Sequence, residues 1–299
     1  MVASLNFLTA CDLGLDCGSL TSMFMAEVPS PTRADLHAVD GRFIVGDEGT
    51  ILHKVDDEAG WSLLPSPTGV DLYGVAFSDP KAVIVGAEGT ILSSDDLGES
   101  WAAPSAPTTA DLLAVVRSAH AWVAVGDGVV LRSTDAVEWT EVEVPVSTRL
   151  NALAVQGGEI WAVGDAGVAL VSRNSGSSWQ AVPTPTSADL LSVSAVDGRT
   201  TIVGAEGLVL IADANTSVFE PVEHEIEVDL FGVREHQAVG AEGLIYRIPV
   251  EDEASTVTEA PGGATLRAID RTGWIIVGDE GTIIEHQVDV DAGCDPNFS

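Results

Sequence analysis

Apolar residues occur along this chain in short runs, which are separated by polar turns rich in Gly, Asp, Ser and Pro. One of these runs ends in Val-Gly, and an acidic turn, usually closed by a second Gly, comes directly after it. Short runs of Val, Ile and Leu between turn residues predict β-strands. The Val-Gly pair occurs seven times, with its glycine at Gly46, Gly86, Gly126, Gly164, Gly204, Gly240 and Gly278.

The spacing of these glycines, 36 to 40 residues, is nearly constant along the chain. A period of about forty residues is typical of a β-propeller, in which each repeat forms one four-stranded blade. We therefore predict an all-β, seven-bladed β-propeller with antiparallel blades over residues 23–290. Residues 1–22 then form an N-terminal segment, and residues 291–299 form a C-terminal tail.

Two details of the repeat bear on how the blades pack. The Gly-x-x-Gly turn after the second strand is expected to supply the positive φ angles of a tight hairpin. A small residue stands in the first strand of every repeat, as the crowded inner strands of a propeller require where they converge on the axis. These small residues are Ala38, Gly74, Ala114, Ala152, Ser192, Gly232 and Ala268.

The two ends of the chain are predicted to meet. An aromatic residue opens the fourth strand of most repeats, as at Trp61, and the same register occurs before the first repeat at Phe24. The seventh repeat lacks a fourth strand of its own. We therefore expect residues 23–28 to supply the outer strand of the last blade, which pairs an otherwise open sheet edge. This closure brings Cys17 and Cys294 together and predicts a disulfide between them.

The turn between the third and fourth strands carries a second motif. Residues 94–101 fit the Asp-box pattern Ser-x-Asp-x-Gly-x-Thr-Trp with Ser for Thr, residues 172–179 fit it with Asn for Asp, and residues 133–139 are a shortened copy. We interpret these turns as structural, because the carboxylate accepts backbone N–H bonds from its own turn and the Trp ring packs between blades. The motif positions are Ser94, Asp96, Gly98, Trp101, Ser172, Asn174, Gly176 and Trp179.

The pattern Val-Gly-x-x-Gly-x-Ile-Leu followed by an Asp-box resembles the propellers of the bacterial neuraminidase (Asp-box) repeat superfamily. Within that superfamily, the repeats are most similar to those of the photosystem II stability and assembly factor family. The resemblance covers residues 24–288. It implies the propeller fold and a role as a non-enzymatic assembly scaffold that binds a protein or peptide partner.

Acidic residues dominate the charge: 46 Asp and Glu stand against 13 Lys and Arg, a formal net charge of −33. This charge excludes a nucleic acid partner, because phosphate contacts need a basic surface. The repeat places many acids in the second-to-third-strand turns and the fourth-to-first connections, which open on one face of a propeller. Those expected to form a binding face are Asp35, Asp47, Asp71, Glu88, Asp111, Asp165, Asp189, Glu206, Asp229, Glu242 and Asp279.

This acidic face has two interpretations. Each Asp can cap the start of an inner strand by accepting hydrogen bonds from turn amides, while each Glu is a solvated turn residue. Collectively, the carboxylates create a negative field that attracts a basic peptide, a cationic protein surface or Ca²⁺. Arg149 and Thr265 occupy the two connection positions without an Asp. Apart from Ca²⁺, for which the sequence holds no specific motif, we expect no cofactor.

Near the N-terminus, residues 8–11 (Leu-Thr-Ala-Cys) match the lipobox of bacterial lipoproteins, whose cysteine is lipidated. The resemblance implies a lipid anchor at Cys11 and a location at the bacterial cell envelope, either lipid-anchored or secreted. Export would also allow Cys17 and Cys294 to oxidise. We expect a monomer that meets a membrane only through this anchor.

The alternative function is that of a secreted glycoside hydrolase or sialidase-like enzyme. Arg247-Ile248-Pro249 matches the Arg-Ile-Pro motif of sialidases, but it stands in the sixth repeat rather than before the first Asp-box. A sialidase also needs an arginine triad and a tyrosine nucleophile, and the chain has only Tyr73 and Tyr246 and no visible arginine cluster. A nucleophile elbow and a phosphate-binding loop are both missing. We therefore predict a protein without catalytic residues.

Overall fold

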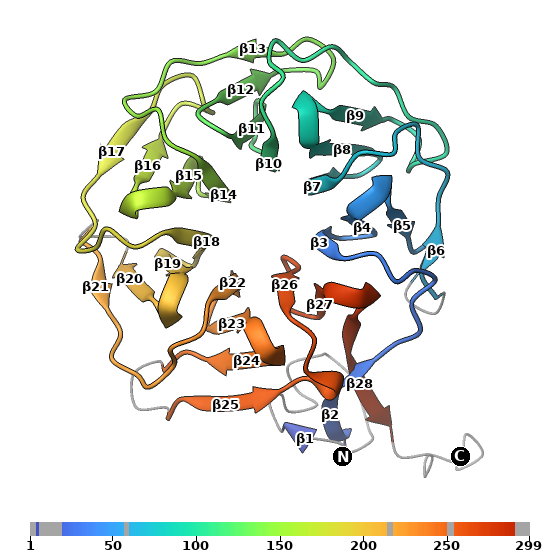
Figure 1. Cartoon of the computed structure of the whole chain (residues 1–299), viewed down its shortest axis with the longest axis vertical. Helices are drawn as coiled ribbons and strands as arrows, with labels where there is room; N and C mark the ends of the chain where they lie inside the picture. The colour runs from blue at the N-terminus through green and yellow to red at the C-terminus, as the bar shows by residue number, and fades with distance from the viewer. Residues whose placement is uncertain (1–3, 6–19, 57–59, 214–217, 250–253, 291–299) are drawn as a thin grey trace, which may run out of the picture.

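The computed structural model describes residues 4–5, 20–56, 60–213, 218–249 and 254–290. They form a seven-bladed β-propeller with antiparallel blades, as predicted, and Figure 1 looks down the axis of the ring. Apart from short 3₁₀ turns, the described residues contain no helix.

Each blade begins with an inner strand beside the central channel and continues outward (Figure 1). Blade 1 contains β3 (Leu36–Asp40), β4 (Phe43–Gly46), β5 (Ile51–His53) and β6 (Ser62–Leu63), and blade 2 contains β7 (Leu72–Ser78), β8 (Lys81–Gly86) and β9 (Ile91–Ser94). Blade 3 contains β10 (Leu112–Arg117), β11 (Trp122–Gly126), β12 (Val130–Ser133) and β13 (Thr140–Glu141), and blade 4 contains β14 (Leu150–Gln156), β15 (Glu159–Gly164), β16 (Ala169–Ser172) and β17 (Gln180–Val182). Blade 5 contains β18 (Leu190–Val196), β19 (Arg199–Gly204), β20 (Val209–Asp213) and β21 (Glu220–Pro221), and blade 6 contains β22 (Leu230–Arg234), β23 (Gln237–Gly240), β24 (Leu244–Arg247) and β25 (Thr256–Glu259). Blade 7 contains β26 (Leu266–Ile269), β27 (Ile275–Gly278), β28 (Ile283–Val290), β2 (Leu20–Glu27) and β1 (Ser4–Leu5).

Blade 7 closes the ring with strands from both ends of the chain. Strand β2 pairs antiparallel with β28, from Glu27 opposite Ile284 to Leu20 opposite Val290. The predicted closing strand is therefore confirmed, although it starts earlier than residue 23. Strand β1 adds a fifth member outside β2. In blade 2, by contrast, the fourth position is reduced to one bridge between Ser93 and Ala102.

The Gly-x-x-Gly turns are 3₁₀ turns whose two glycines serve different purposes. The turns contain positive φ angles, as predicted, but Gly86 is not among the residues that adopt them, because it is extended with φ −166°. A Cβ atom on Gly86 would lie 2.2 Å from the carbonyl oxygen of Asp71, which leaves room for glycine alone. Gly89 has φ +70°, and Glu88 before it has φ +56°. The first glycine therefore permits a close backbone approach, and the second permits a left-handed conformation.

The hydrophobic core lies between blades, because each of its clusters combines residues of two neighbouring blades. One cluster joins Phe43 and Val45 of blade 1 to Leu72 and Ile84 of blade 2. Small inner residues are needed, as predicted, since a Cβ atom on Gly74 would lie 3.0 Å from the Cα atom in the next blade's inner strand. This packing holds the inner strands at fixed positions around the channel, and with them the turns at its two mouths.

Candidate functional site

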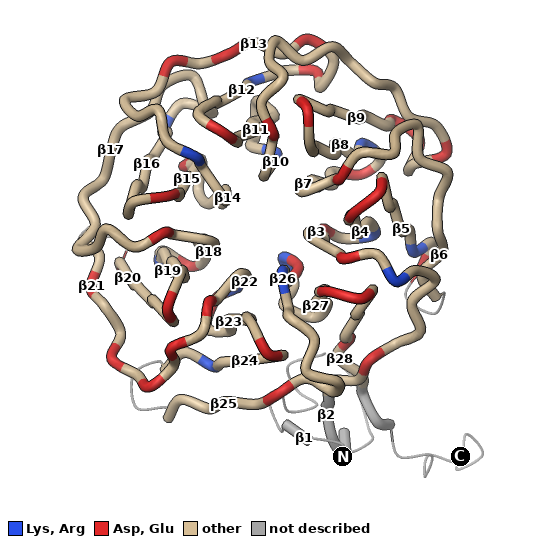
Figure 2. The backbone as a smooth tube through the Cα atoms, viewed as in Figure 1, with Lys and Arg blue, Asp and Glu red and all other residues tan. Residues whose placement is uncertain are grey.

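The second-to-third-strand turns and the fourth-to-first connections lie together on the face that Figures 1 and 2 show. In blade 2 the amide of Ala87, in the turn, donates to the carbonyl of Asp71, in the connection, at 2.9 Å, and blades 1, 3, 4, 5, 6 and 7 repeat this bond. Figure 2 shows Asp and Glu on these turns and connections around the ring. We call this side the acidic face, defined by the predicted acids and the turn residues beside them.

Five of the connection aspartates join neighbouring blades. The Oδ1 atom of Asp71, in blade 2, accepts a 2.9 Å hydrogen bond from the amide of Glu48, in the turn of blade 1. The prediction that each Asp bonds a turn amide therefore holds, but the amide belongs to the preceding blade. The five pairs, acceptor first, are Asp35 with Glu280, Asp71 with Glu48, Asp111 with Glu88, Asp189 with Ala166 and Asp229 with Glu206.

The junction between blades 3 and 4 uses a different contact. The turn of blade 3 is shortened to Asp127-Gly128, so the amide that an aspartate would bind is missing. Arg149 occupies the aspartate's position, and its guanidinium lies 3.1 Å from the Asp127 carboxylate. An ion pair thus replaces the hydrogen bond found at the five regular junctions.

The turn glutamates have a different environment from the aspartates. Five of the six complete turns place Glu in the left-handed region, at φ angles of 54° to 58°, where Gly and Asn are the usual residues. Each of these side chains is exposed and makes no hydrogen bond or ion pair within the described part of the chain. The turn itself does not need a carboxylate, since Ala166 holds the sixth position. The five are Glu48, Glu88, Glu206, Glu242 and Glu280.

A β-bulge lies near the start of every inner strand. In β7, for example, the register shifts between Leu72 and Gly74, which re-aims the intervening Tyr73. The seven bulge residues line a cavity of about 160 Å³ at the channel mouth on the acidic face. They are His37, Tyr73, Leu113, Asn151, Leu191, Phe231 and Arg267.

The type of each bulge residue is related to the type of the first residue in its blade's second-to-third-strand turn. Where that turn residue is Asp, the bulge residue of three blades is its polar partner: His37 Nε2 lies 2.6 Å from Asp47, Asn151 donates to Asp165 at 2.9 Å, and Arg267 donates to Asp279. Where the turn residue is Ala, as in blades 2, 5 and 6, the bulge residue is Tyr73, Leu191 or Phe231. The sequence analysis missed this rule, although the pairs can be read from the repeats once they are aligned.

Tyr73 lies among the carboxylates of Asp71, Asp111 and Asp47. Its ring is half-buried, with the His37 ring at 5.5 Å in an edge-on arrangement. Burial raises the pKa of the Tyr73 phenol, and the negative charges of Asp71, Asp111 and Asp47 raise it further. The phenol is therefore neutral at physiological pH and lies in a negative field.

The opposite mouth of the channel has the reverse charge character. A cavity of about 330 Å³ there is lined by Arg117, Arg234 and Arg271 together with Asp40 and Asp270. Asp40 is buried, which raises its pKa, and it accepts hydrogen bonds from Arg271 and from the amide of Phe77. These arginines lie at the other end of the channel, and on the acidic face Arg149 and Arg267 pair with Asp127 and Asp279 rather than with the turn glutamates.

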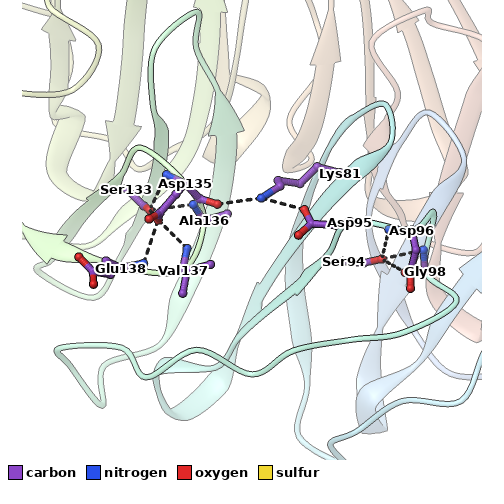
Figure 3. Close-up of polar contacts among 10 residues, drawn as sticks. All are labelled: Lys81, Ser94, Asp95, Asp96, Gly98, Ser133, Asp135, Ala136, Val137 and Glu138. Atoms are coloured by element: carbon purple, nitrogen blue, oxygen red, sulfur yellow. Dashed lines mark hydrogen bonds and ion pairs between the residues drawn. The ribbon is translucent and has the colours of Figure 1, made fainter.

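The Asp-box turns also lie away from the acidic face, because they join the third and fourth strands. Figure 3 shows the turns of blades 2 and 3. Asp96 accepts hydrogen bonds from the Ser100 hydroxyl at 2.6 Å, the Ser100 amide at 2.9 Å and the Ser94 hydroxyl at 2.7 Å. Lys81 links the two turns, with its Nζ atom 2.8 Å from both the Asp135 carbonyl and the Asp95 carboxylate.

The aromatic ring that ends each Asp-box packs on the preceding blade. Trp101 meets Phe43 of blade 1 edge-on at 5.9 Å, and Trp179 is buried against Val123 of blade 3. The motif glycines serve the same contact: Gly176 has φ +79°, and a Cβ atom on it would lie 2.5 Å from the Val123 side chain. These contacts assign the motif residues to packing and turn formation.

Solved structures similar to this chain are propellers, whereas no protein-family model and no curated protein matches its sequence. The structure of YCF48 bound to D1 peptide is 15% identical, with a TM-score of 0.73, over 89% of this chain and 95% of that one. YCF48 from Cyanidioschyzon merolae is 15% identical, with a TM-score of 0.68, over 87% of this chain and 98% of that one. The WD40 propeller domain of Doa1 is 12% identical, with a TM-score of 0.68, over 87% of this chain and 95% of that one. The shared property is the β-propeller fold.

The remaining predicted residues lie outside this site. Cys11, Cys17 and Cys294 fall outside the described residues. Tyr246 is 1% exposed and packs in the core with Ile248, so the Arg-Ile-Pro motif begins at the last residue of β24 and its isoleucine is a core residue.

Among the described residues, no three His, Cys, Asp or Glu side chains group closely enough to hold a metal ion. No helix in the described part of the chain is long and apolar enough to cross a membrane.

One prediction concerns the Asp-box of blade 2. Hydrogen bonds from Ser100 and Ser94 lower the pKa of Asp96 to about 2. A lowered pKa stabilises the fold above the ordinary Asp pKa, and this contribution is lost as the pH falls through about 2. Asp96→Asn should therefore melt somewhat below the wild type at neutral pH, where it lacks this contribution, and lose less stability in acid. The variant should keep the turn, because Asn174 accepts the equivalent bond from the Ser178 amide at 2.9 Å.

Melting temperatures across the acid range check this prediction, with Asn174→Asp as the reciprocal variant. That variant should gain the acid dependence that Asp96→Asn loses. Equal acid dependence in all three proteins would contradict the assignment.

Proposed function

We propose that this protein is a non-enzymatic scaffold whose acidic face binds a cationic segment of a protein or peptide partner. The observation that carries the proposal is the set of five turn glutamates. A left-handed turn position favours Gly or Asn, yet the chain places Glu there repeatedly, exposed and unpaired within the described residues. Local structure does not account for these carboxylates, whereas recognition of positive charge does.

The anatomy of the face supports the same function. Half-buried Tyr73, Leu113, Leu191 and Phe231 form an apolar centre at the channel mouth, and the carboxylates surround it. An apolar centre within a polar rim is the usual arrangement of a protein-binding surface. The negative field of the rim would steer a cationic partner and set its orientation. A similar propeller, YCF48, has been solved with a bound peptide, which supports a peptide or protein as the class of partner.

We further propose that the protein acts at the bacterial cell envelope. The lipobox match at residues 8–11 supports a lipid anchor on Cys11. The pairing of β2 with β28 supports a disulfide between Cys17 and Cys294, because it places Leu20 opposite Val290, a few residues along the chain from each cysteine. The intact mass of the protein extracted from membranes, before and after reduction, checks both modifications.

Replacing the five turn glutamates by glutamine tests the proposed function. The affinity for an oligolysine peptide should fall at least about tenfold, since each exposed ion pair contributes a few tenths of a kcal/mol. The wild-type affinity should also weaken with added salt. Titration calorimetry at low and physiological ionic strength measures both effects. The aspartates are unsuitable for this test, because Asp71 and its equivalents hold the blades together.

A matched control removes the same charge elsewhere. Glu99, Glu138, Glu141, Glu220 and Glu235 lie in the Asp-box turns, the outer strands and the turn between β22 and β23, and changing them to glutamine should leave the affinity within about twofold. Equal loss in the two variants would show that total charge, and not the acidic face, governs binding. Wild-type protein that does not bind the peptide would overturn the proposed function.

A further inference from the structure

One arginine of the chain itself forms a cation–π contact with an aromatic ring of the acidic face. The Arg267 guanidinium lies 5.9 Å from the centre of the Phe231 ring, in the neighbouring blade. Asp279 accepts a hydrogen bond from this arginine, and Asp35 lies 4.0 Å from it. A guanidinium between an aromatic face and carboxylates is a favourable arrangement, because the ring quadrupole and the carboxylates attract the same charge.

The repeat places Tyr73 in the position of Phe231, but no cation of the described chain covers its ring. Leu113 occupies the position in the next blade that Arg267 occupies beside Phe231. Carboxylates are nonetheless close to this ring, since the negative charges of Asp71, Asp111 and Asp47 raise the pKa of the Tyr73 phenol. The positive charge of Arg149 lowers the pKa of Tyr73, but its guanidinium lies 3.1 Å from the Asp127 carboxylate. The Tyr73 site thus has a ring with carboxylates near it, as the Phe231 site has, but no arginine of the described chain on the ring. Its carboxylates are not the equivalents of Asp279 and Asp35, whose places in the repeat hold Asp127 and Arg149.

The carboxylates beside Tyr73 can also accept further hydrogen bonds. Asp71 and Asp111 each use Oδ1 to accept an amide from the preceding blade, and their Oδ2 atoms accept no hydrogen bond from the described residues. Half-buried Leu113 offers an apolar surface for the methylene stem of a long side chain. The site therefore presents separate surfaces for the stem and for the charged end of such a side chain.

We propose that the channel mouth beside Tyr73 binds an arginine side chain of the partner, with its guanidinium over the Tyr73 ring and its N–H groups toward Asp71 and Asp111. Arginine fits better than lysine, because its planar group stacks on a ring while donating in plane to carboxylates. This inference rests on the proposed function and names the anchor residue of the cationic segment. The bulge in β7 is what turns the Tyr73 ring into the mouth.

Two substitutions test the site, with an oligolysine peptide that contains one central arginine as the probe. Tyr73→Leu removes the ring and should weaken binding about five- to thirtyfold, the range of a partly desolvated cation–π contact. Phe231→Leu is the matched control, because Arg267 already covers that ring, and it should change the affinity less than about twofold. Melting temperatures establish that both variants are folded.

A second pair of variants adds an arginine to the channel mouth instead of removing an aromatic ring. Leu113→Arg should place a cation over Tyr73, as Arg267 lies over Phe231, and exclude the probe's arginine. Leu191→Arg adds the same charge at the mouth, but the bulge residue of the preceding blade there is Asn151 and not an aromatic residue, so it should weaken binding much less. If the wild type binds the probe but Tyr73→Leu matches Phe231→Leu, the arginine site is wrong while the proposed function stands. If the wild type does not bind the probe, both fail.

Discussion

Gly126→Ala should prevent the propeller from folding stably. A Cβ atom at this position would lie 1.8 Å from the carbonyl oxygen of Asp111, with both groups in the backbone of blade 3. No rotation of a side chain can relieve that overlap, so the turn and the start of the inner strand must separate. We expect a loss of more than about 4 kcal/mol in the free energy of unfolding, which few single substitutions reach.

Urea unfolding followed by circular dichroism measures this loss, and Gly69→Ala is the control. Gly69 lies in a connection on the same face, has no heavy atom within 4 Å of an added Cβ and does not have a positive φ. The control should change stability by less than about 0.5 kcal/mol. A Gly126→Ala protein within about 1 kcal/mol of the wild type would show that the blade tolerates a wider turn.

Removing residues 1–27 should destroy the cooperative unfolding of the ring. Strand β2 pairs with β28 along its whole length, and Met25 packs against the cluster of Val239, Ile276 and Ile284. Without β2, the edge of β28 is unpaired, and part of the core between blades 6 and 7 is uncovered. We expect a lower melting temperature, a broad transition and association of the chains through the open edge.

Removing only residues 1–19 is the control, since it keeps β2 and discards everything before it. This shorter truncation should remain monomeric in size-exclusion chromatography and unfold in one transition. A synthetic peptide of residues 20–29 should also restore the melting temperature of the longer truncation. Identical melting of the two truncations would mean that β2 contributes little to ring closure.

Much of this architecture was predictable because every blade repeats the same local signals. The Val-Gly spacing gave the number of blades, and the unpaired aromatic register at Phe24 gave the closing strand. The small residue at Gly74 followed from crowding near the axis, which the backbone contact with Ala114 confirms. A signal that recurs in each repeat outweighs the ambiguity of any single short strand.

The candidate site was predictable only in part. Its carboxylates could be placed on one face, because turns and connections alternate regularly between the two sides of a blade. Asp71 and Glu88 were both predicted for the binding face, with the alternative that each Asp bonds turn amides and each Glu is solvated, and the structure shows that difference between them. Asp71 binds the backbone of its neighbour, and the Glu88 side chain is free among the described residues. Tyr73 was considered only as a possible nucleophile, and the β-bulge that turns it into the mouth has no local sequence signal of its own.

The blade count, the strand order and the surplus of negative charge thus follow from the linear repeat alone. The partner of each carboxylate does not, because it belongs to another blade. Glu48 and Asp71 are 23 residues apart, while Glu280 and Asp35 make the same hydrogen bond across 245 residues. Only closure of the ring makes these two pairs equivalent, since it turns a separation of 245 residues into one more junction between neighbouring blades.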